Sequence, residues 1–396
     1  MTVPSSRSTR SSDLAAGIVE LDVAIVGAGP AGAAAAIALN GAGLRVGVIE
    51  KAELPRYKTC GGGVLRRAAA LLPLDFDSVI ERNCFAAELV HHAPGLRFVC
   101  RREKPIISMV MRDRFDHLLV KTAEQGGAML MAGTTVLDVQ AMADGVRLTM
   151  NVGEIRAGFV IAADGANSLV ARKTGYPELR DVVPALEAEV TLSPLEMERW
   201  TQTARFDFGF VPAGYAWVFP KREHLSIGVL TTRRGAANLP EYYRKYLDHL
   251  GIGTPLHEER HGYIIPCRPR ARLFASPRIL LVGDAAGLAD PVTAEGITAG
   301  ILSGQLAARA ILRAGGDVSS VQRTYQATLQ KQLLGDLRIA RGLAALLYHS
   351  PRLRALLLSR YGQRVSELVT KIVMGETTYG AAVRRPGNYL KLLRRR

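Results

Sequence analysis

Short apolar runs flanked by glycine recur along the chain and predict buried parallel strands. Residues 21–26 form the first run, and an alanine-rich stretch, 30–40, follows it and predicts a helix. A second apolar run, 44–49, comes after that helix, and a third, 278–282, lies far along the chain. The order strand, helix, strand near the N-terminus is typical of an α/β fold with a Rossmann-type unit.

Other segments alternate polar and apolar positions, which is typical of antiparallel strands with one solvated face. Residues 84–110 and much of 181–269 show this pattern, with a helix expected near 241–250. Towards the C-terminus the spacing of apolar residues predicts helices. The expected organisation is a flexible tail, a discontinuous Rossmann-type domain, a β-rich substrate domain and a C-terminal helical region. Their expected residues are, in that order, 1–20; 21–83, 111–180 and 270–315; 84–110 and 181–269; and 316–396.

Composition and charge narrow the class of protein. Hydrophobic residues make up 48% and charged residues 22% of the 396 positions, which is typical of a globular chain. The net charge of +15 favours an anionic partner, such as a membrane surface, a phosphorylated substrate or nucleic acid. The four cysteines form no C-x-x-C pair, and glycines interrupt the longest apolar stretch. We predict a cytoplasmic protein with possible peripheral contact to the inner face of the membrane.

The first candidate site is a glycine-rich turn between the first strand and helix, Gly27-Ala28-Gly29-Pro30-Ala31-Gly32. Gly27 permits a tight turn, Gly29 lets the backbone approach a pyrophosphate, and Gly32 lets the helix pack closely on the strand. The pyrophosphate is then expected at the helix N-terminus, where unpaired N–H groups favour anions. Glu50 ends the next strand, where a carboxylate can bind ribose hydroxyls, and Lys51 follows it. This context predicts a dinucleotide without a 2′-phosphate, which FAD satisfies.

Two acidic segments support the same interpretation. Asp164-Gly165 and Gly283-Asp284 each follow an apolar run, and each is nonspecific alone, because Asp-Gly is commonly just a turn. In this order, and with the glycine-rich turn, they resemble the FAD-dependent oxidoreductases of the para-hydroxybenzoate hydroxylase fold over residues 20–310. The resemblance implies that both segments support the cofactor.

Two less common motifs resemble a narrower family. The segment Pro55-Arg56-Tyr57-Lys58-Thr59-Cys60-Gly61-Gly62-Gly63 is similar to the P-x-x-K-x-C-G-G-G segment of the geranylgeranyl reductase family. The segment Tyr215-Ala216-Trp217-Val218-Phe219-Pro220, followed by Gly228, is similar to that family's substrate-pocket motif, Y-x-W-x-F-P…G-x-G. Arg112 is similar to the family's FAD-contacting arginine. The resemblance implies cofactor contacts from Cys60, Gly61, Gly62 and Arg112, and substrate contacts from Tyr215, Trp217, Phe219 and Pro220.

The chain departs from that family at two positions. Leu230 stands where the family has its second glycine, which leaves the pocket shape and the substrate open. Ala294 replaces a glycine in the segment that the family places over the flavin, 291–297. It is expected to change little beyond local backbone freedom. Gly296 and Ile297, at the end of this segment, are expected to contact the cofactor.

Two interpretations of the candidate site stay open. Tyr215, Trp217 and Phe219 alternate along a strand and share one face, so they either line an isoprenoid pocket or form a core stripe of the sheet. Cys60 precedes three glycines that let the backbone lie against a flat ring. Its thiol either donates a catalytic proton or simply lines the pocket as a small residue.

Three further patterns concern metals, membranes and nucleic acid. Residues 257–261 match H-E-x-x-H, but that zinc pattern needs a helix and glycine and proline flank it here, so no metal is expected. The arginine-rich helix near 333–358 either lies on an anionic membrane or forms the basic face of a bundle packed on the core. The basic C-terminal tail, residues 384–396, has no nucleic-acid recognition motif beside it, so nucleic acid is not an expected partner.

The predicted function, by resemblance, is an FAD-dependent reductase that saturates C=C bonds of an isoprenoid, geranylgeranyl-type chain in a lipid or pigment precursor. The electron donor is expected to be NAD(P)H or ferredoxin; no second G-x-G-x-x-G motif marks another nucleotide domain. Two alternatives stay open. One is a flavin-dependent monooxygenase of the same fold, and the other is a non-catalytic flavoprotein that binds prenyl lipid.

Overall fold

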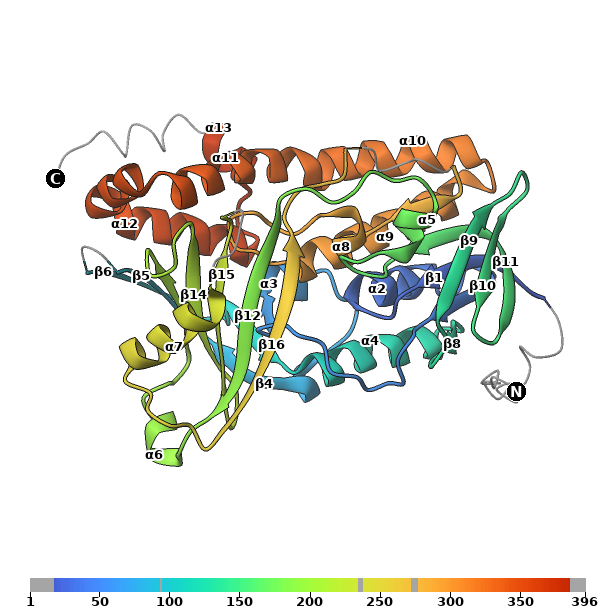
Figure 1. The fold of residues 1–396 in the computed structure, drawn as a ribbon. Helices are drawn as coiled ribbons and strands as arrows, with labels where there is room; N and C mark the ends of the chain where they lie inside the picture. Colours follow the sequence, from blue (N-terminus) through green and yellow to red (C-terminus); the bar gives the residue numbers. More distant parts are fainter. Residues whose placement is uncertain (1–17, 93–94, 234–237, 272–276, 385–396) are drawn as a thin grey trace.

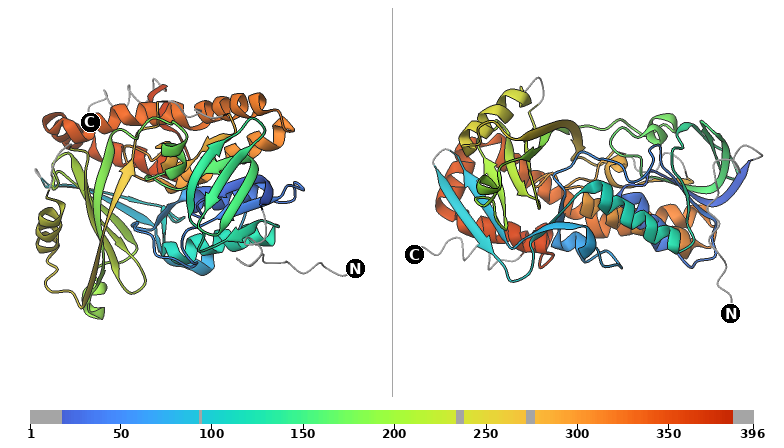
Figure 2. Two further views of the ribbon diagram at one scale, coloured as in Figure 1. Left: turned by 45° about the vertical axis from the view of Figure 1, so that its right-hand side comes forward. Right: turned by 90° about the horizontal axis from the view of Figure 1, so that it is seen from below.

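The computed structural model describes residues 18–92, 95–233, 238–271 and 277–384. Two large sheets lie side by side, and the C-terminal helices run along both of them (Figure 1). The two views in Figure 2 show the first sheet at one end of the molecule and the second sheet at the other. Most of the expected tail, 1–20, and the basic residues 385–396 lie outside the described residues.

The first sheet has seven strands in the order β8-β2-β1-β11-β10-β9, with β17 pairing on β11. The apolar runs form the strands β1, β2 and β17. Strand β1 pairs in parallel with β2 and β11, β2 with β8, and β17 with β11. Strand β10 pairs antiparallel with both β9 and β11. The strand bounds are β1 (Val19–Val26), β2 (Val46–Ile49), β8 (Met129–Met131), β9 (Val136–Ala141), β10 (Val146–Met150), β11 (Gly153–Ala162) and β17 (Ile279–Leu281).

Three helices pack around this sheet: α2 (Pro30–Leu39), α4 (Arg112–Gln125) and α9 (Ile297–Ala314). Helix α2 contacts both α4 and α9. Its approach to α9 depends on Gly304, because a Cβ there would lie 2.1 Å from the Ala31 carbonyl oxygen. The N-terminus of α2 is thereby held at the carboxyl ends of the parallel strands, where ligands bind in open α/β sheets.

The second sheet also has seven strands, in the order β16-β12-β15-β14-β13-β5-β6, and all neighbours are antiparallel except β13 and β5. One face packs on α7 (Leu239–Leu250) through a cluster of buried apolar side chains, and the other face turns towards the first sheet. The strand bounds are β5 (Ala86–His91), β6 (Leu96–Arg101), β12 (Val182–Thr191), β13 (Thr203–Phe208), β14 (Gly214–Pro220), β15 (Leu225–Thr231) and β16 (His257–Pro266).

Shorter elements connect the two sheets. A three-stranded sheet consists of β3 (Gly63–Leu65), β7 (Ile107–Val110) and β4 (Ile80–Cys84). Strand β7 belongs to this small sheet, although its residues fall in a segment assigned above to the substrate domain. The remaining short helices are α3 (Arg66–Ala69), α5 (Leu169–Lys173), α6 (Pro194–Met197) and α8 (Gly283–Ala286), and a 3-10 turn spans Asp77–Val79.

The C-terminal region is helical, as the apolar spacing predicts. It consists of α10 (Val318–Leu329), a π-helical turn (Gln330–Leu334), α11 (Gly335–His349), α12 (Pro351–Met374) and α13 (Tyr379–Arg384). Helix α12 packs directly on β6, where a Cβ at Gly362 would lie 1.9 Å from the Phe98 ring. The predicted fold class, α/β with a Rossmann-type unit, a β-rich part and C-terminal helices, is confirmed; the exact domain boundaries stay predictions.

Candidate functional site

A cavity of about 980 Å³ runs between the two large sheets and collects most of the residues singled out by sequence. Gly32 and Pro220 are the two exceptions. The expected site residues that line the cavity are Gly27, Gly29, Pro30, Ala31, Glu50, Lys51, Cys60, Gly61, Gly62, Arg112, Asp164, Gly165, Tyr215, Trp217, Phe219, Gly283, Asp284, Gly296 and Ile297. Motifs that are up to 270 residues apart therefore meet around a single space.

The glycine-rich turn occupies one end of this cavity. Gly27 has φ +103°, and a Cβ there would lie 2.4 Å from the Ala163 carbonyl oxygen. At Gly32 a Cβ would lie 2.0 Å from the Gly27 carbonyl oxygen, so Gly32 serves close packing and not the cavity surface. At Gly29 the nearest atom to such a Cβ is 3.9 Å away, and no side chain caps the helix that begins at Pro30. This leaves room and N–H donors for an anion.

Glu50 is buried beside this turn. Its Oε2 accepts the Ala28 N–H at 2.9 Å, and its Oε1 accepts the Ala52 N–H at 3.2 Å. Arg56 Nη2 lies 3.6 Å from the Glu50 carboxylate, and Arg56 Nη1 donates to Asp116 at 3.0 Å. Arg56 is a functional candidate that the sequence argument missed, although it stands inside the quoted Pro55–Gly63 segment.

Arg112 shares the Asp116 carboxylate with Arg56. It donates to Asp116 through Nε at 2.8 Å and through Nη2 at 2.9 Å, and it lines the cavity. The nearby Asp116 and Cys60 raise the pKa of the Arg112 guanidinium, whereas burial alone would lower it. Arg112 is therefore a fixed positive charge between the glycine-rich turn and Cys60.

The Cys60–Gly63 segment crosses the middle of the cavity. Gly62 has φ +73°, and a Cβ there would lie 2.1 Å from the Val110 carbonyl oxygen. A Cβ at Gly61 would lie 2.9 Å from Phe219 and 3.2 Å from Nε1 of Trp217. The two family-like motifs, separate in sequence, are therefore in direct contact.

The aromatic stripe of β14 forms one wall of the cavity. Tyr215, Trp217 and Phe219 follow one another at ring separations of 6.0 and 6.2 Å, and all three line the cavity. Phe206 on the neighbouring strand extends this wall. The expected substrate contact from Pro220 is not supported, because Pro220 follows the strand alternation to the opposite face. The stripe is thus both a packed cluster and a cavity wall.

The two departures from the family pattern have different consequences. Leu230 pairs with Tyr215 across β15 and β14, is fully buried and lines the cavity, so its side chain narrows the end of the cavity beside the aromatic stripe. Ala294 has φ +55°, a conformation that favours glycine. The expected effect of Ala294 on local backbone freedom thus takes the form of backbone strain at this residue.

The two acidic segments contribute buried carboxyl groups. Asp284 accepts the Tyr263 hydroxyl at 3.2 Å, and Asp164 accepts the Val170 N–H at 3.1 Å. Burial raises the pKa of both carboxyl groups. Lys58, which sequence analysis did not single out, lies with Nζ 3.3 Å from the Tyr263 ring centroid, and burial together with Arg112 lowers the pKa of Lys58 to about 8.

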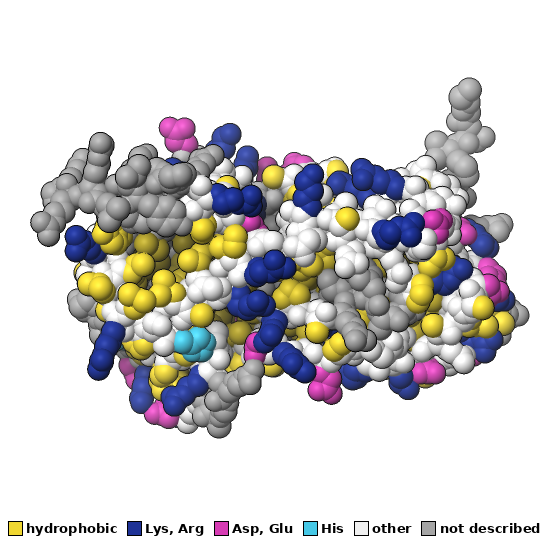
Figure 3. All heavy atoms as spheres, turned by 90° about the horizontal axis from the view of Figure 1, so that it is seen from above, with side chains coloured by type: hydrophobic (Ala, Val, Ile, Leu, Met, Phe, Trp, Pro, Cys, Tyr) yellow, Lys and Arg dark blue, Asp and Glu magenta, His cyan; other side chains and the backbone are white. Residues whose placement is uncertain are grey.

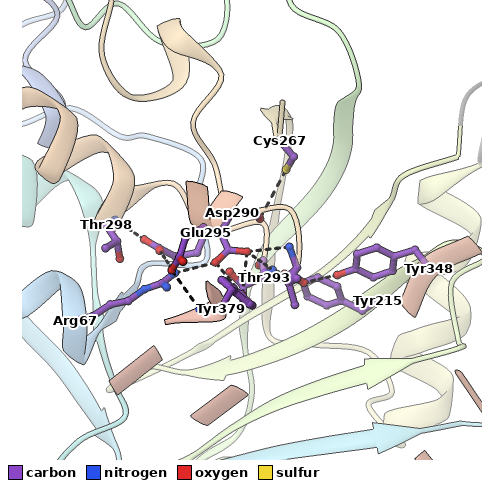
Figure 4. Close-up of polar contacts among 11 residues, drawn as sticks. Arg67, Tyr215, Cys267, Asp290, Thr293, Glu295, Thr298, Tyr348 and Tyr379 are labelled. Atoms are coloured by element: carbon purple, nitrogen blue, oxygen red, sulfur yellow. Dashed lines mark hydrogen bonds and ion pairs between the residues drawn. The ribbon is translucent and has the colours of Figure 1, made fainter. Parts of the chain in front are cut away.

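A hydrogen-bonded cluster anchors the loop 290–296 at the far side of the cavity (Figure 4). Asp290 accepts the Val292 N–H at 2.9 Å, the Tyr379 hydroxyl at 3.0 Å and Arg67 Nη2 at 3.0 Å. Glu295 shares Arg67 at 3.4 Å. The loop is thus tied to α3 and α13, which lie far from it in sequence.

Two further hydroxyl groups hold the same loop. Tyr215 donates to the Thr293 carbonyl oxygen at 2.6 Å, and Tyr348 of α11 donates to the Val292 carbonyl oxygen (Figure 4). The wall residue Tyr215 therefore connects the second sheet to the loop. None of these long-range contacts was expected from the sequence.

The C-terminal helices line the end of the cavity beside the aromatic stripe. Leu358, Val365, Val369 and Val373 follow one face of α12 and line the cavity together with Leu347 of α11. Arg354, one of the arginines considered for membrane contact, is instead buried, and its Nη1 donates to the Leu347 carbonyl oxygen at 2.7 Å. At Arg354 the helix therefore packs on the core.

Two expectations about the rest of the chain can be compared with the structure. The H-E-x-x-H segment is strand β16, not a helix, and no cluster of possible metal ligands occurs among the described residues. Within the same described ranges, no helix is both long and apolar enough to cross a membrane.

The cofactor end fits FAD. Three observations support the fit: open space at Gly29 in front of an uncapped helix N-terminus, the buried Glu50 carboxylate beside it, and Asp284 at the start of α8. Residues 20–313 match the family described as "FAD binding domain". The fold and the site therefore define an FAD-dependent oxidoreductase.

Comparisons with individual proteins narrow this class. The chain is 33% identical to digeranylgeranylglycerophospholipid reductase 1 of Methanopyrus kandleri, over 83% of this chain and 91% of that protein. It is 31% identical to menaquinone reductase of Mycolicibacterium smegmatis, over 82% and 84%. A geranylgeranyl bacteriochlorophyll reductase-like protein from Thermoplasma acidophilum has the same fold, with a TM-score of 0.74, 24% identity and coverage of 95% and 96%. The chain belongs to the geranylgeranyl reductase family of FAD-dependent oxidoreductases.

Proposed function

We propose that this protein is an FAD-dependent reductase that saturates C=C bonds in an isoprenoid, geranylgeranyl-type chain of a lipid or pigment precursor. The observation that carries the proposal is the contact between Gly61 and the side chains of Trp217 and Phe219 inside one cavity. This contact puts an aromatic wall directly beside the segment expected to hold the flavin. The names of two relatives, a prenyl-lipid reductase and a menaquinone reductase, agree with such a substrate.

The far end of the cavity has the chemistry of an isoprenoid site. Its lining is aromatic on the sheet side and aliphatic on the helix side, where Val365, Val369 and Val373 face it. A branched hydrocarbon chain gains free energy by leaving water for such a lining. The same lining excludes water from a reacting double bond.

The residues at the other end would hold the cofactor. The first turn of α2 would bind the pyrophosphate, Glu50 the ribose hydroxyls, and Asp284 the ribityl chain. Bound FAD supplies the hydride chemistry, while the protein orients the chain and keeps it dry. The Cys60 Sγ accepts the Gly62 N–H at 3.4 Å, and its thiol keeps both proposed roles, as a proton donor or as a lining group.

Electron donors and partners follow from charge. A net charge of +15 suits an acidic ferredoxin, and NAD(P)H is the other proposed donor. We also propose peripheral contact of this cytoplasmic protein with an anionic membrane through the start of α12. Leu353 and Leu356 are 47% and 62% exposed there, beside exposed Arg352 and Arg360. Figure 3 views this side, where hydrophobic side chains gather at the left among spread Lys and Arg side chains.

The experiment that tests the proposed function compares products with and without oxygen. Chemically reduced protein is mixed with geranylgeranyl lipids and prenylated quinones, and the masses of the products are measured by mass spectrometry. A reductase adds the mass of two hydrogens per double bond without oxygen. A monooxygenase adds one oxygen mass and only when oxygen is present. A non-catalytic flavoprotein releases both compounds unchanged, and either of these two results would overturn the proposal.

A further inference from the structure

A buried carboxyl group lies on the cavity face of the second sheet, and nothing proposed above uses it. Glu187, on β12, is 2% exposed and lines the cavity. It pairs with Gly228 on β15, and Gly228 pairs with Trp217 on β14. Directly paired residues on antiparallel strands project from the same face, so Glu187 stands in one row with the central residue of the aromatic wall.

The glycine between them lets the indole lie across the row. A Cβ at Gly228 would lie 2.1 Å from Cζ2 of Trp217, so the indole covers Gly228 on β15, the strand next to Glu187. The Trp217 Nε1 is buried without a hydrogen-bond partner and lies close to Gly61. The carboxyl group, the indole and the flavin-side loop therefore meet in one part of the cavity.

Neutral hydroxyl groups hold Glu187. The Ser226 hydroxyl donates to Oε1 at 2.9 Å, and the Tyr57 hydroxyl lies within donating distance of Oε2 at 3.5 Å. Ser226 is fully buried, whereas Tyr57 is 42% exposed. Glu187 is thus oriented inside the cavity, and the phenol of Tyr57 connects it to the surface.

The cations of this region pair with a different carboxylate. Lys221 Nζ lies 2.8 Å from Oε1 of Glu189, and His224 Nε2 lies 2.8 Å from its Oε2. No ion pair to Glu187 occurs in the part of the chain that the structure describes. The His261 ring lies 4.4 Å from the Tyr57 ring. Besides Glu187, the titratable groups Glu189, Glu259 and Cys60 also act on the Tyr57 hydroxyl.

Burial and the neighbouring Glu189 favour the protonated form of Glu187. Burial raises the pKa of Glu187 to about 8, the charge of Glu189 adds to the rise, and Lys221 opposes it. The Glu187 carboxyl stands beside the aromatic wall inside the cavity, where it can face a bound substrate. A carboxylic acid in such a place can act as a general acid.

We propose that Glu187 supplies the proton that completes reduction of the substrate double bond; this inference rests on the proposed function. The alkene accepts a hydride from the reduced flavin at one carbon and the Glu187 proton at the other. With reduced FAD bound, the alkene π bond, the O–H bond of Glu187 and the bond that holds the hydride on the flavin would break, and two C–H bonds would form. The alkene is reduced by two electrons, the flavin is oxidised by two, and solvent reprotonates the carboxylate past Tyr57.

The kinetic test uses Glu187→Gln, which keeps the shape and removes the acid. Glu154→Gln is the matched control, because Glu154 is partly exposed at the start of β11 and does not line the cavity. Anaerobic stopped-flow follows the oxidation of reduced protein by a geranylgeranyl lipid. We expect Glu187→Gln to slow this half-reaction by roughly a hundredfold while flavin content and flavin reduction stay unchanged. The wild-type rate should fall as pH rises through about 8, and the variant should lose that dependence.

A second readout does not depend on turnover. The folded-state pKa of Glu187 lies above its unfolded value, so the wild type loses stability as pH rises between these two values. The melting temperature of Glu187→Gln should therefore rise relative to that of the wild type as pH increases between these two values. A pH-independent difference would contradict a protonated Glu187.

The outcomes separate the two proposals. If wild-type protein reduces no prenyl compound, the proposed function fails and the role of Glu187 fails with it. If the wild type is active and Glu187→Gln matches its rate and pH profile, only the assignment of Glu187 is overturned. In that case Cys60→Ser, measured in the same half-reaction, tests the thiol as the proton source.

Discussion

The two ends of the cavity are built in different ways. At the cofactor end, Gly27 and Gly29 belong to one turn, and Glu50 ends the next strand. At the substrate end, Trp217 of β14 and Val369 of α12 come from segments far apart in sequence. Backbone geometry fixes the first end, and side-chain packing fixes the second. Substitutions at the two ends should therefore separate cofactor binding from substrate turnover.

The largest expected effect is loss of FAD in Gly29→Val. The branched side chain would fill the open space in front of the α2 N-terminus, and we expect FAD affinity to fall at least roughly a hundredfold. The ratio of flavin to protein after purification measures this. Gly342→Val is the control, because no atom lies within 4 Å of a Cβ there. A Gly29→Val protein with full FAD would show that the pyrophosphate lies elsewhere.

Trp217→Ala removes part of the aromatic wall at the other end of the cavity. We expect kcat/KM for a prenyl substrate to fall roughly tenfold or more while FAD stays bound, because the indole forms the wall and not the cofactor turn. Trp200→Ala, which alters the other tryptophan of the chain, is the control. Parallel loss of flavin, activity and melting temperature would mean that the stripe serves only as core.

Tyr379→Phe weakens the loop that joins the two ends. The variant removes a hydroxyl that donates to buried Asp290, and we expect the free energy of unfolding to fall by about 1–2 kcal/mol. Urea denaturation measures this change. Tyr361→Phe, on partly exposed α12, should stay close to the wild type. An unchanged Tyr379→Phe would show that the cluster in Figure 4 adds no stability.

The smallest effect is expected at the strained position of the same loop. Ala294→Gly removes the penalty of φ +55° but increases the freedom of the unfolded chain, so we expect a net gain of about 0.5 kcal/mol. Ala345→Gly, at an exposed helical position, should instead lose about 1 kcal/mol. Equal losses in both variants would contradict the strain at Ala294.

Sequence reasoning found residues of the cavity lining where the pattern depends on local spacing. The turn at Gly29, the acid at Glu50 and the aromatic alternation at Trp217 each depend on short-range geometry that a sequence displays. The family resemblance added the segment 60–62 as a cofactor contact, but it did not show that this segment touches Trp217. The register of β14 and the path of the loop were needed for that.

Sequence reasoning failed where packing reverses the meaning of a pattern. In β12 the apolar Leu186 and Ala188 alternate with Glu187 and Glu189, which is typical of a strand with a solvated acidic face. The structure instead covers that face with the cavity. The apolar face of α12 indicated burial in the same way, but its spacing does not say which element covers it. Long-range pairing decides both cases.

The central claim is that one cavity holds a reduced flavin against an isoprenoid double bond. Its most direct test is an anaerobic single turnover, in which reduced protein is mixed with a geranylgeranyl lipid and flavin absorbance and product mass are followed together. We predict that oxidised flavin appears in proportion to the double bonds saturated, with two hydrogens added per bond. Flavin that stays reduced until oxygen is admitted, with the lipid unsaturated as before, would contradict the account.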